Sequence, residues 1–409
     1  MKPWMQPLMA IAATILVCAP LKAAAQEESE PLDAPPAPEV SASQYEAVWT
    51  QFIASDVTSP GGSEIRYGAK LDGYARVEGR DLGLWPGLTL SAHGEFVYGD
   101  NTNNAGAGLI LPVNTALAFP GSSGTDADLA VSISQRLGPA VLTLGKINMI
   151  DRVSMTPLVG GGGRAGFQHI ALAAPPTIFT PPSILGALLS FPVGRLRVSA
   201  GIWDTQSAVG KTGLENPFAE GVAGMVGVTL PIAIGGRPGF QSLTVMGNNK
   251  RGLDLEDVPD LILPPQGEAA AGERRGGWLV RYAFQQFLWQ DAAKPSRGGG
   301  LFGQVSLWDE NPTPLRWSLN LGLIGSVPFA SRPLDRFGLA YFKTSLSPVL
   351  RRGLAPLVVL GPEQGAEAFY TIDLFKGEVQ ATLTAQLVDP APEAAETAVF
   401  LGIRTMLRF

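Results

Sequence analysis

The sequence has 409 residues, of which 45% are hydrophobic and only 16% are charged, and its mean hydropathy is +0.15. An ordinary soluble domain carries about 25% charged residues, so this composition is unusual for a soluble protein. The formal net charge of −6 gives no basis for a nucleic-acid partner, because such partners favour a basic surface.

The N-terminus predicts an exported protein. Residues 8–21 form the one continuous apolar stretch that resembles a membrane span, after a weakly basic start with Lys2. Small residues follow at Ala23, Ala24 and Ala25, as in a signal-peptide cleavage site. We therefore predict that residues 1–25 are a signal peptide that is removed.

Two features of the N-terminal region follow from this prediction. The single cysteine, Cys18, lies inside the predicted signal, so the mature chain would contain no disulfide; lipid attachment at Cys18 is a less favoured alternative. Residues 26–44 are acidic and rich in proline, with too little apolar surface to offset the entropy of ordering. They predict a periplasmic segment that precedes the folded domain.

From Tyr45 onward the chain reads as strand-like runs separated by clusters of Gly, Pro, Asn and Asp. The sixteen predicted strands span residues 45–54, 66–78, 88–99, 128–137, 141–149, 184–191, 196–204, 222–231, 240–248, 276–289, 299–309, 315–327, 335–346, 365–375, 377–388 and 397–409. Many have roughly the 9 to 11 residues that a tilted strand needs to cross the hydrocarbon core of a membrane.

The alternation of side chains is clearest between Tyr67 and Tyr98. In the first of these strands Ala69 and Leu71 share one face, whereas Lys70 and Asp72 share the other. An exported, hydrophobic chain without helical spans can satisfy its backbone polar groups in lipid as a closed barrel. This interpretation places the apolar faces against lipid and the polar faces in the lumen.

The connections between the predicted strands support the same fold. Short connections, such as residues 376–377 and 138–140, alternate with long ones, such as 100–127 and 150–183. Short turns on one side, long loops on the other and an even strand count are typical of bacterial outer-membrane barrels. We predict an all-β, transmembrane antiparallel β-barrel of about 16 strands over residues 45–409, with short periplasmic turns and long extracellular loops.

Several short motifs resemble the carbohydrate-selective porin family. They are Leu82-Gly83-Leu84-Trp85-Pro86-Gly87-Leu88, Leu111-Pro112-Val113-Asn114, Gly201-Ile202-Trp203-Asp204 and Phe218-Ala219-Glu220-Gly221-Val222. The last strand, which ends at Phe409, is similar to the closing strand of the family and to the signal read by the outer-membrane assembly machinery. The resemblance implies a sixteen-stranded barrel in the outer membrane of a Gram-negative cell that passes sugars by diffusion, and a homotrimer is one assembly it could form.

The polar faces supply the candidate lining of the channel. The lining residues are predicted to include Lys70, Asp72, Arg76, Glu78, His93, Glu95, Arg136, Arg281, Arg316, Asn320, Glu378, Gln380 and Gln386. Those on the two strands between Tyr67 and Tyr98 mix both signs of charge, which suits the hydroxyl groups of a sugar better than the selection of ions. The alternative is that these side chains are solvated lumen charges.

A constriction is predicted from the loop at residues 150–183, which carries Asp151, Arg152, Arg164, Gln168 and His169. An ordinary surface loop is the alternative, and the loop at 100–127 is a second candidate for the constriction. Trp203, near the end of a strand, is the residue predicted to stack on a sugar ring. Other aromatic residues, including Trp278, Tyr282, Trp308 and Tyr341, are predicted to form girdles at the membrane edges.

No catalytic residue, cofactor site or metal site is predicted. The stretch Gly161–Gly166 spells G-x-G-x-x-G, but Pro175 and Pro176 prevent a long helix after it. With two histidines and no mature cysteine, a His/Cys zinc site is improbable. The acidic residues at 254–260 are interpreted as a solvated loop, with calcium binding as the alternative.

The predicted function is passive diffusion of small carbohydrates through an outer-membrane porin. The alternatives are a general or anion-preferring porin, an outer-membrane barrel enzyme of the phospholipase kind that would use Ser91 and His93, and a secreted sugar-binding β-sandwich.

Overall fold

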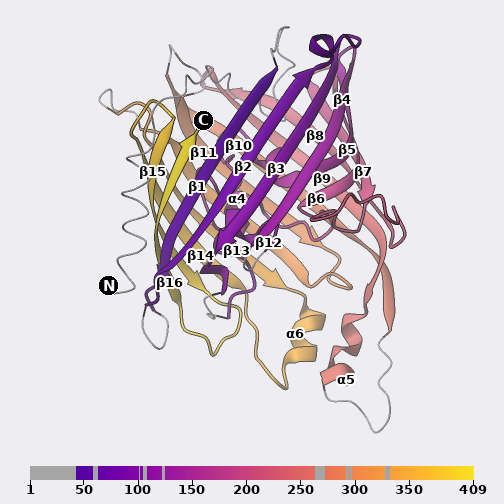
Figure 1. Cartoon of the computed structure of the whole chain (residues 1–409). Coiled ribbons are helices and arrows are strands. Elements are labelled where there is room, and N and C mark those ends of the chain that lie inside the picture. Colours follow the sequence, from indigo (N-terminus) through magenta and orange to yellow (C-terminus); the bar gives the residue numbers. More distant parts are fainter. Residues whose placement is uncertain are drawn as a thin grey trace.

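Figure 1 shows the computed structural model of the chain, which describes residues 43–58, 63–100, 102–104, 108–121, 125–262, 272–291, 294, 297–327 and 332–409. The predicted signal peptide and nearly all of the predicted N-terminal segment lie outside these described residues. The described strands form a closed antiparallel barrel, in which β1 (Gln44–Asp56) completes the ring by pairing with β16 (Ala398–Arg408). The prediction of a sixteen-stranded barrel is confirmed for the part of the chain that the structure describes.

The other strands are β2 (Arg66–Glu78), β3 (Leu88–Gly99), β4 (Asp126–Leu137), β5 (Ala140–Asn148), β6 (Ser183–Val193), β7 (Leu196–Asp204), β8 (Val222–Ile234), β9 (Arg237–Leu253), β10 (Glu273–Gln290), β11 (Gly298–Trp308), β12 (Leu315–Ser326), β13 (Arg336–Leu346), β14 (Glu363–Asp373) and β15 (Val379–Asp389). The connections contain short helices: η1 (Gly79–Leu82), η2 (Thr102–Asn104), α2 (Thr115–Ala118), α3 (Met149–Ser154), α4 (Ile170–Ala173), η3 (Leu255–Asp257), α5 (Val258–Ile262) and α6 (Pro348–Leu354). Among the described residues, no helix has the length and apolar character needed to cross a membrane.

The strands β9 and β10 are longer than predicted. Their outer ends pair through polar residues, for example Arg251 with Arg275, that an alternation of apolar residues does not mark. These ends lie toward the side of the barrel that carries α5 and α6, whereas the C-terminus lies toward the opposite end (Figure 1). The two ends of the barrel therefore differ, with long loops at one and short turns at the other.

The outer wall of the barrel is apolar. On β4 the side chains of Leu129, Val131 and Ile133 are 57%, 49% and 47% exposed, whereas Asp128 and Ala130 between them are buried. Successive residues of a strand point to opposite faces, so the exposed apolar residues belong to the outside of the barrel. This is the surface that lipid covers in an outer-membrane barrel.

Part of the barrel interior is a hydrophobic core rather than an aqueous lining. The loops after β3 and β5 fold inward and bring Leu111, Phe167 and Leu172 into one buried cluster with Phe342 and Phe400 of the wall. Figure 1 shows α4, from the second of these loops, within the outline of the barrel. The expectation that inward faces line water is therefore wrong for the wall around β11 to β16, where the two loops cover it.

Candidate functional site

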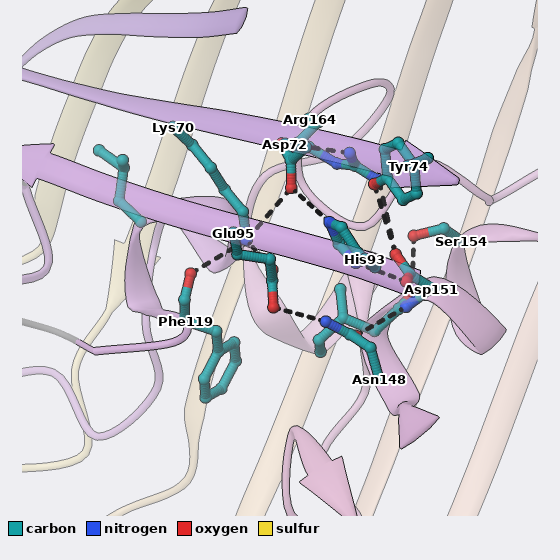
Figure 2. Close-up of polar contacts among 12 residues, drawn as sticks. Lys70, Asp72, Tyr74, His93, Glu95, Phe119, Asn148, Asp151, Ser154 and Arg164 are labelled. Atoms are coloured by element: carbon teal, nitrogen blue, oxygen red, sulfur yellow. Dashed lines mark hydrogen bonds and ion pairs between the residues drawn. The ribbon is translucent and has the colours of Figure 1, made fainter. Parts of the chain in front are cut away.

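Five of the predicted site residues meet at one place in the barrel (Figure 2). Lys70 and Asp72 lie on β2, His93 and Glu95 lie on β3, and Arg164 comes from the loop that follows β5. The strand register places Asp72 directly opposite Glu95, so alternation alone brings the four wall residues together. We call these five residues, together with Tyr74 and Asp151, the charged cluster.

The ammonium group of Lys70 is fully used inside the charged cluster. Its Nζ atom donates to the carboxylate of Glu95 and to the backbone oxygen of Phe119, 3.0 Å away. The second oxygen of Glu95 accepts from the side-chain amide of Asn148, at the end of β5. Lys70 and Glu95 are both buried, so this ion pair closes one side of the cluster.

His93 joins the wall to the inward-folded loop. Its Nε2 atom lies 3.0 Å from Oδ1 of Asp72, and its Nδ1 atom lies 2.6 Å from Oδ2 of Asp151 on α3. A neutral imidazole has only one N–H donor, and an ionised carboxylate only accepts. Two carboxylate partners therefore require the doubly protonated imidazolium form, and His93 acts as a cation between two acids.

Arg164 makes the second link between the loop and the wall. Its guanidinium lies 3.2 Å from Asp72 and 3.8 Å from Asp151, and its Cζ atom lies 5.3 Å from the centre of the Tyr74 ring. Tyr74 in turn stacks on His93 with ring centres 4.1 Å apart. Burial opposes the charged form, but the neighbouring carboxylates raise the pKa of Arg164 well above its usual value, so the guanidinium stays charged.

Local sequence explains how the loop reaches this position. Asn148 ends β5 and caps α3, because its side-chain oxygen accepts from the backbone N–H of Asp151, 3.1 Å away. The same side chain donates to Glu95, so one residue sets both the start of α3 and its place against β3. Asp151 is the least buried acid of the charged cluster, with its side chain 27% exposed.

The other predicted site residues lie elsewhere. Arg76 and Glu78 form a separate pair 3.5 Å apart, at the periplasmic end of β2. Arg152 lies next to Asp151 on α3, and its Nε atom has no hydrogen-bond partner within the described residues. Burial lowers the pKa of Arg152, although nearby Asp151 partly compensates.

The prediction that Trp203 stacks on a sugar is wrong for this structure. Its indole is fully buried and donates from Nε1 to the backbone oxygen of Phe179, 2.9 Å away. Trp308, which was predicted to lie in a membrane girdle, is also buried and donates to the backbone oxygen of Thr177. Both indoles hold the second half of the inward loop against the wall. By contrast, Trp278 is 48% exposed on the outer surface, as predicted for a girdle.

Further wall residues bind the loops through their backbone. The carboxylate of Glu367 on β14 accepts from the N–H groups of Gln168 and His169, at 2.7 and 2.8 Å. Glu363, one turn of alternation earlier, accepts from the N–H groups of Ile110 and Leu111 in the other loop. Sequence analysis missed both acids, although their inward alternation on β14 was the available indication.

Three residues predicted to line water have the same anchoring role. Arg281 donates to the backbone oxygens of Pro175 and Pro176, Asn320 donates to Ala171, and Gln386 donates to Val113. Each of these acceptors lies in an inward-folded loop. A polar side chain on the inner face of the barrel therefore does not by itself indicate contact with solute.

His169 is neutral. Its ring is fully buried, stacks on Phe342 with centres 4.0 Å apart, and accepts from the backbone N–H of Ala171. Burial lowers its pKa from 6.5 to about 3. The imidazole is therefore a packing group of the loop core.

Asp72, His93 and Glu95 lie close enough to surround a metal ion, since one ligand atom of each falls within 4.8 Å of the others. These atoms are already engaged by Lys70 and Arg164 or by one another. A dication would have to displace these cations, so the donor set favours an ion-pair cluster over a metal site. In the acidic loop, Asp254 accepts from Asn311 and from the backbone of Glu256, which are structural contacts.

A closed sixteen-stranded barrel with an apolar outer belt, two inward-folded loops and a charged cluster where one loop meets the wall defines an outer-membrane porin. The model of the carbohydrate-selective porin, OprB family, matches residues 64–409. The chain belongs to this family. It is thus a carbohydrate porin of the outer membrane, as the sequence motifs implied. No curated protein sequence matches the chain.

Solved structures show the same fold. The high-pH structure of Pseudomonas putida OprB is 14% identical, with a TM-score of 0.76, and the match covers 90% of this chain and 94% of that one. The low-pH structure of the same protein is 12% identical, with a TM-score of 0.49 and coverage of 90% and 93%. Pseudomonas aeruginosa OpdK with vanillate is 10% identical, with a TM-score of 0.47 and coverage of 90% and 98%.

Proposed function

We propose that the charged cluster forms the selective constriction through which small carbohydrates diffuse without energy coupling. The observation that supports this is the double link between loop and wall, made by His93 with Asp151 and by Arg164 with Asp72. These contacts bring both signs of charge to the middle of β2 and β3. The cluster contains three cationic groups and three carboxylates among its members, so it favours neither sign of ion strongly.

A neutral polyol can exchange hydrogen bonds with groups of this kind without leaving a charge unpaired. Asp151, with its partly exposed carboxylate, is the acceptor nearest to solvent, and Arg152 offers a guanidinium beside it. Lys70, Glu95 and Asp72 are buried and act as the support of these two residues. This division assigns the contact with sugar to the loop and the positioning to the wall.

Swelling of proteoliposomes tests the proposal. We expect faster swelling with monosaccharides than with amino acids of similar size. The substitution Asp151→Asn, which removes the exposed charge, should reduce this preference, whereas Glu220→Gln in an extracellular loop serves as a control that loses the same charge. Equal rates for sugars and amino acids in the unmodified protein would favour a general porin.

An anion-preferring porin is the second candidate, and one observation favours it. Arg281, Arg336 and Arg404 face the interior and donate to backbone oxygens of the loops rather than to carboxylates. Their positive charge is therefore not neutralised by the contacts they make. A reversal potential that shows strong chloride preference across a salt gradient would support this candidate over the first.

We expect no lipase activity. Ser91 and His93 share the inner face of β3, but both ring nitrogens of His93 are occupied by carboxylates. The imidazole therefore has no lone pair with which to activate a serine. We expect Ser91→Ala to leave sugar transport unchanged, and hydrolysis of a phospholipid substrate by the unmodified protein would contradict the assignment.

The remaining expectations concern processing and assembly. Removal of residues 1–25 and a periplasmic segment over 26–44 stay predictions, which the N-terminal sequence of the mature protein would check. Phe409, whose backbone pairs with Ala47, is proposed as the residue read by the assembly machinery, alongside contact of the outer wall with membrane lipid. A homotrimer is checked by the mass of the protein in detergent.

A further inference from the structure

A row of polar residues crosses the inner wall on the side that the charged cluster leaves open. Ser190 on β6 pairs with Ser199 on β7, Ser199 pairs with Gly227 on β8, and Gly227 pairs with Thr244 on β9. Paired residues of neighbouring strands point to the same face. Ile202, beside this row, is 53% exposed on the outer wall, so the intervening positions of the row face the lumen.

The row continues to Arg281 on β10, which pairs with Thr244. Ser190 lies near the periplasmic end of β6, whereas Arg281 lies near the middle of β10. Because barrel strands are tilted, a row that follows their register climbs along the channel. Arg281 then donates to Pro175 in the inward-folded loop, so the row leads from that loop toward the periplasmic mouth.

Gly227 opens a gap in the middle of the row. A Cβ atom at this position would lie 2.8 Å from Oγ of Ser199 and 3.3 Å from Oγ1 of Thr244. The glycine therefore leaves a recess between two hydroxyl groups that any other residue would fill. Its backbone is not in the left-handed region, so the need for a left-handed turn does not explain the glycine.

We propose that Ser190, Ser199, Gly227 and Thr244 form a second binding site, a hydroxyl track, for neutral polyols such as a sugar ring on its way to the periplasm. A hydroxyl group both donates and accepts, so it can match either end of a sugar hydroxyl without the desolvation cost of a charge. Contacts of this strength are made and broken easily, which a conducting site requires. The inference rests on the proposed function, because it assumes that carbohydrates pass the charged cluster.

Block of single-channel ion current by added glucose tests the track. We expect the double variant Ser199→Ala/Thr244→Val to weaken the apparent affinity for glucose about fivefold, while the potassium chloride conductance stays unchanged, since each lost hydrogen bond is modest. Gly227→Ala should weaken glucose block by filling the recess. Thr244→Ser, which keeps the hydroxyl, should retain the affinity.

Two controls make the result interpretable. Gly73→Ala introduces the same methyl group on the outer wall, where a Cβ atom has no neighbour within 4 Å, and should change nothing. Ser91→Ala/Ser132→Ala removes two paired hydroxyls of another part of the wall and should also leave the block unchanged. If all variants bind glucose as the unmodified protein does, the hydroxyl track is wrong while the charged-cluster proposal stands. If the unmodified protein shows neither block nor sugar preference, both are overturned.

Discussion

The strongest prediction concerns the carboxylate that fastens the second inward loop to the wall. Glu367 is fully buried and accepts three hydrogen bonds: two from the adjacent backbone N–H groups of Gln168 and His169, and one from Gln386 at 3.1 Å. The substitution Glu367→Ala leaves all three donors without this acceptor. We therefore expect the loop to leave the wall more often.

The magnitude follows from these contacts. Each buried donor left without a partner costs about 1–3 kcal/mol. Part of this cost is offset because a carboxylate no longer has to be kept out of water. We expect a net loss of about 2–4 kcal/mol in loop docking, which shifts the docked equilibrium about 30- to 1,000-fold. The apolar contacts of Phe167 and Leu172 remain, so the barrel itself should stay folded.

Planar-bilayer recording measures the consequence. We expect Glu367→Ala to show larger conductance or frequent wide substates, and liposomes that contain it to swell with oligosaccharides that the unmodified protein excludes. Glu367→Gln should have a smaller effect, because the amide oxygen can still accept one of the bonds. Glu220→Ala removes an acid from an exposed ion pair with Lys250 and should change little. Unaltered conductance and solute exclusion in Glu367→Ala would refute the anchoring role.

Three further predictions address the cluster and the loop. His93→Gln supplies one donor group where the imidazolium supplies two, so we expect about 1–2 kcal/mol less loop stability and a lower ratio of sugar to amino-acid swelling; an unchanged ratio would argue against the link through Asp151. Arg152→Ala should shift the reversal potential toward cations while the unfolding temperature stays within a few degrees, and a shift toward anions would contradict the orientation of this guanidinium. The low pKa of His169 means that the folded state resists its protonation, so its contribution to stability is complete above pH 6.5 and declines as pH falls from 6.5 toward 3. His169→Phe should therefore lose less thermal stability between pH 7 and pH 4 than the unmodified protein; an identical loss would show that the ring is not buried in solution.

The charged cluster shows how far strand periodicity leads. Lys70, Asp72, His93 and Glu95 could be placed together from sequence, because two neighbouring strands joined by a short turn fix their own register. Tyr74 followed from the same alternation. Arg164 could be named as a candidate but not assigned to Asp72, because a loop of this length has no periodicity that fixes its path.

Trp203 shows where the same reasoning fails. Alternation correctly places its side chain on the inner face, yet the inward loop covers it and takes its N–H group. The same holds for Arg281, Asn320 and Gln386, which local pattern assigned to water and which bind loop backbone instead. An inner face is a property of the strand, whereas contact with solute depends on what else occupies the barrel.

The sequence by itself determined the strands, their two faces, the closed barrel and the family, because each follows from local alternation, turn residues and short motifs. Only the tertiary structure decided which part of the lumen stays open, since that depends on contacts between residues far apart in the chain, such as Glu367 and Gln168, separated by 199 positions. A carboxylate that binds two backbone N–H groups needs no particular side chain on its partner. Such a contact therefore leaves little trace in the sequence of the loop that it holds.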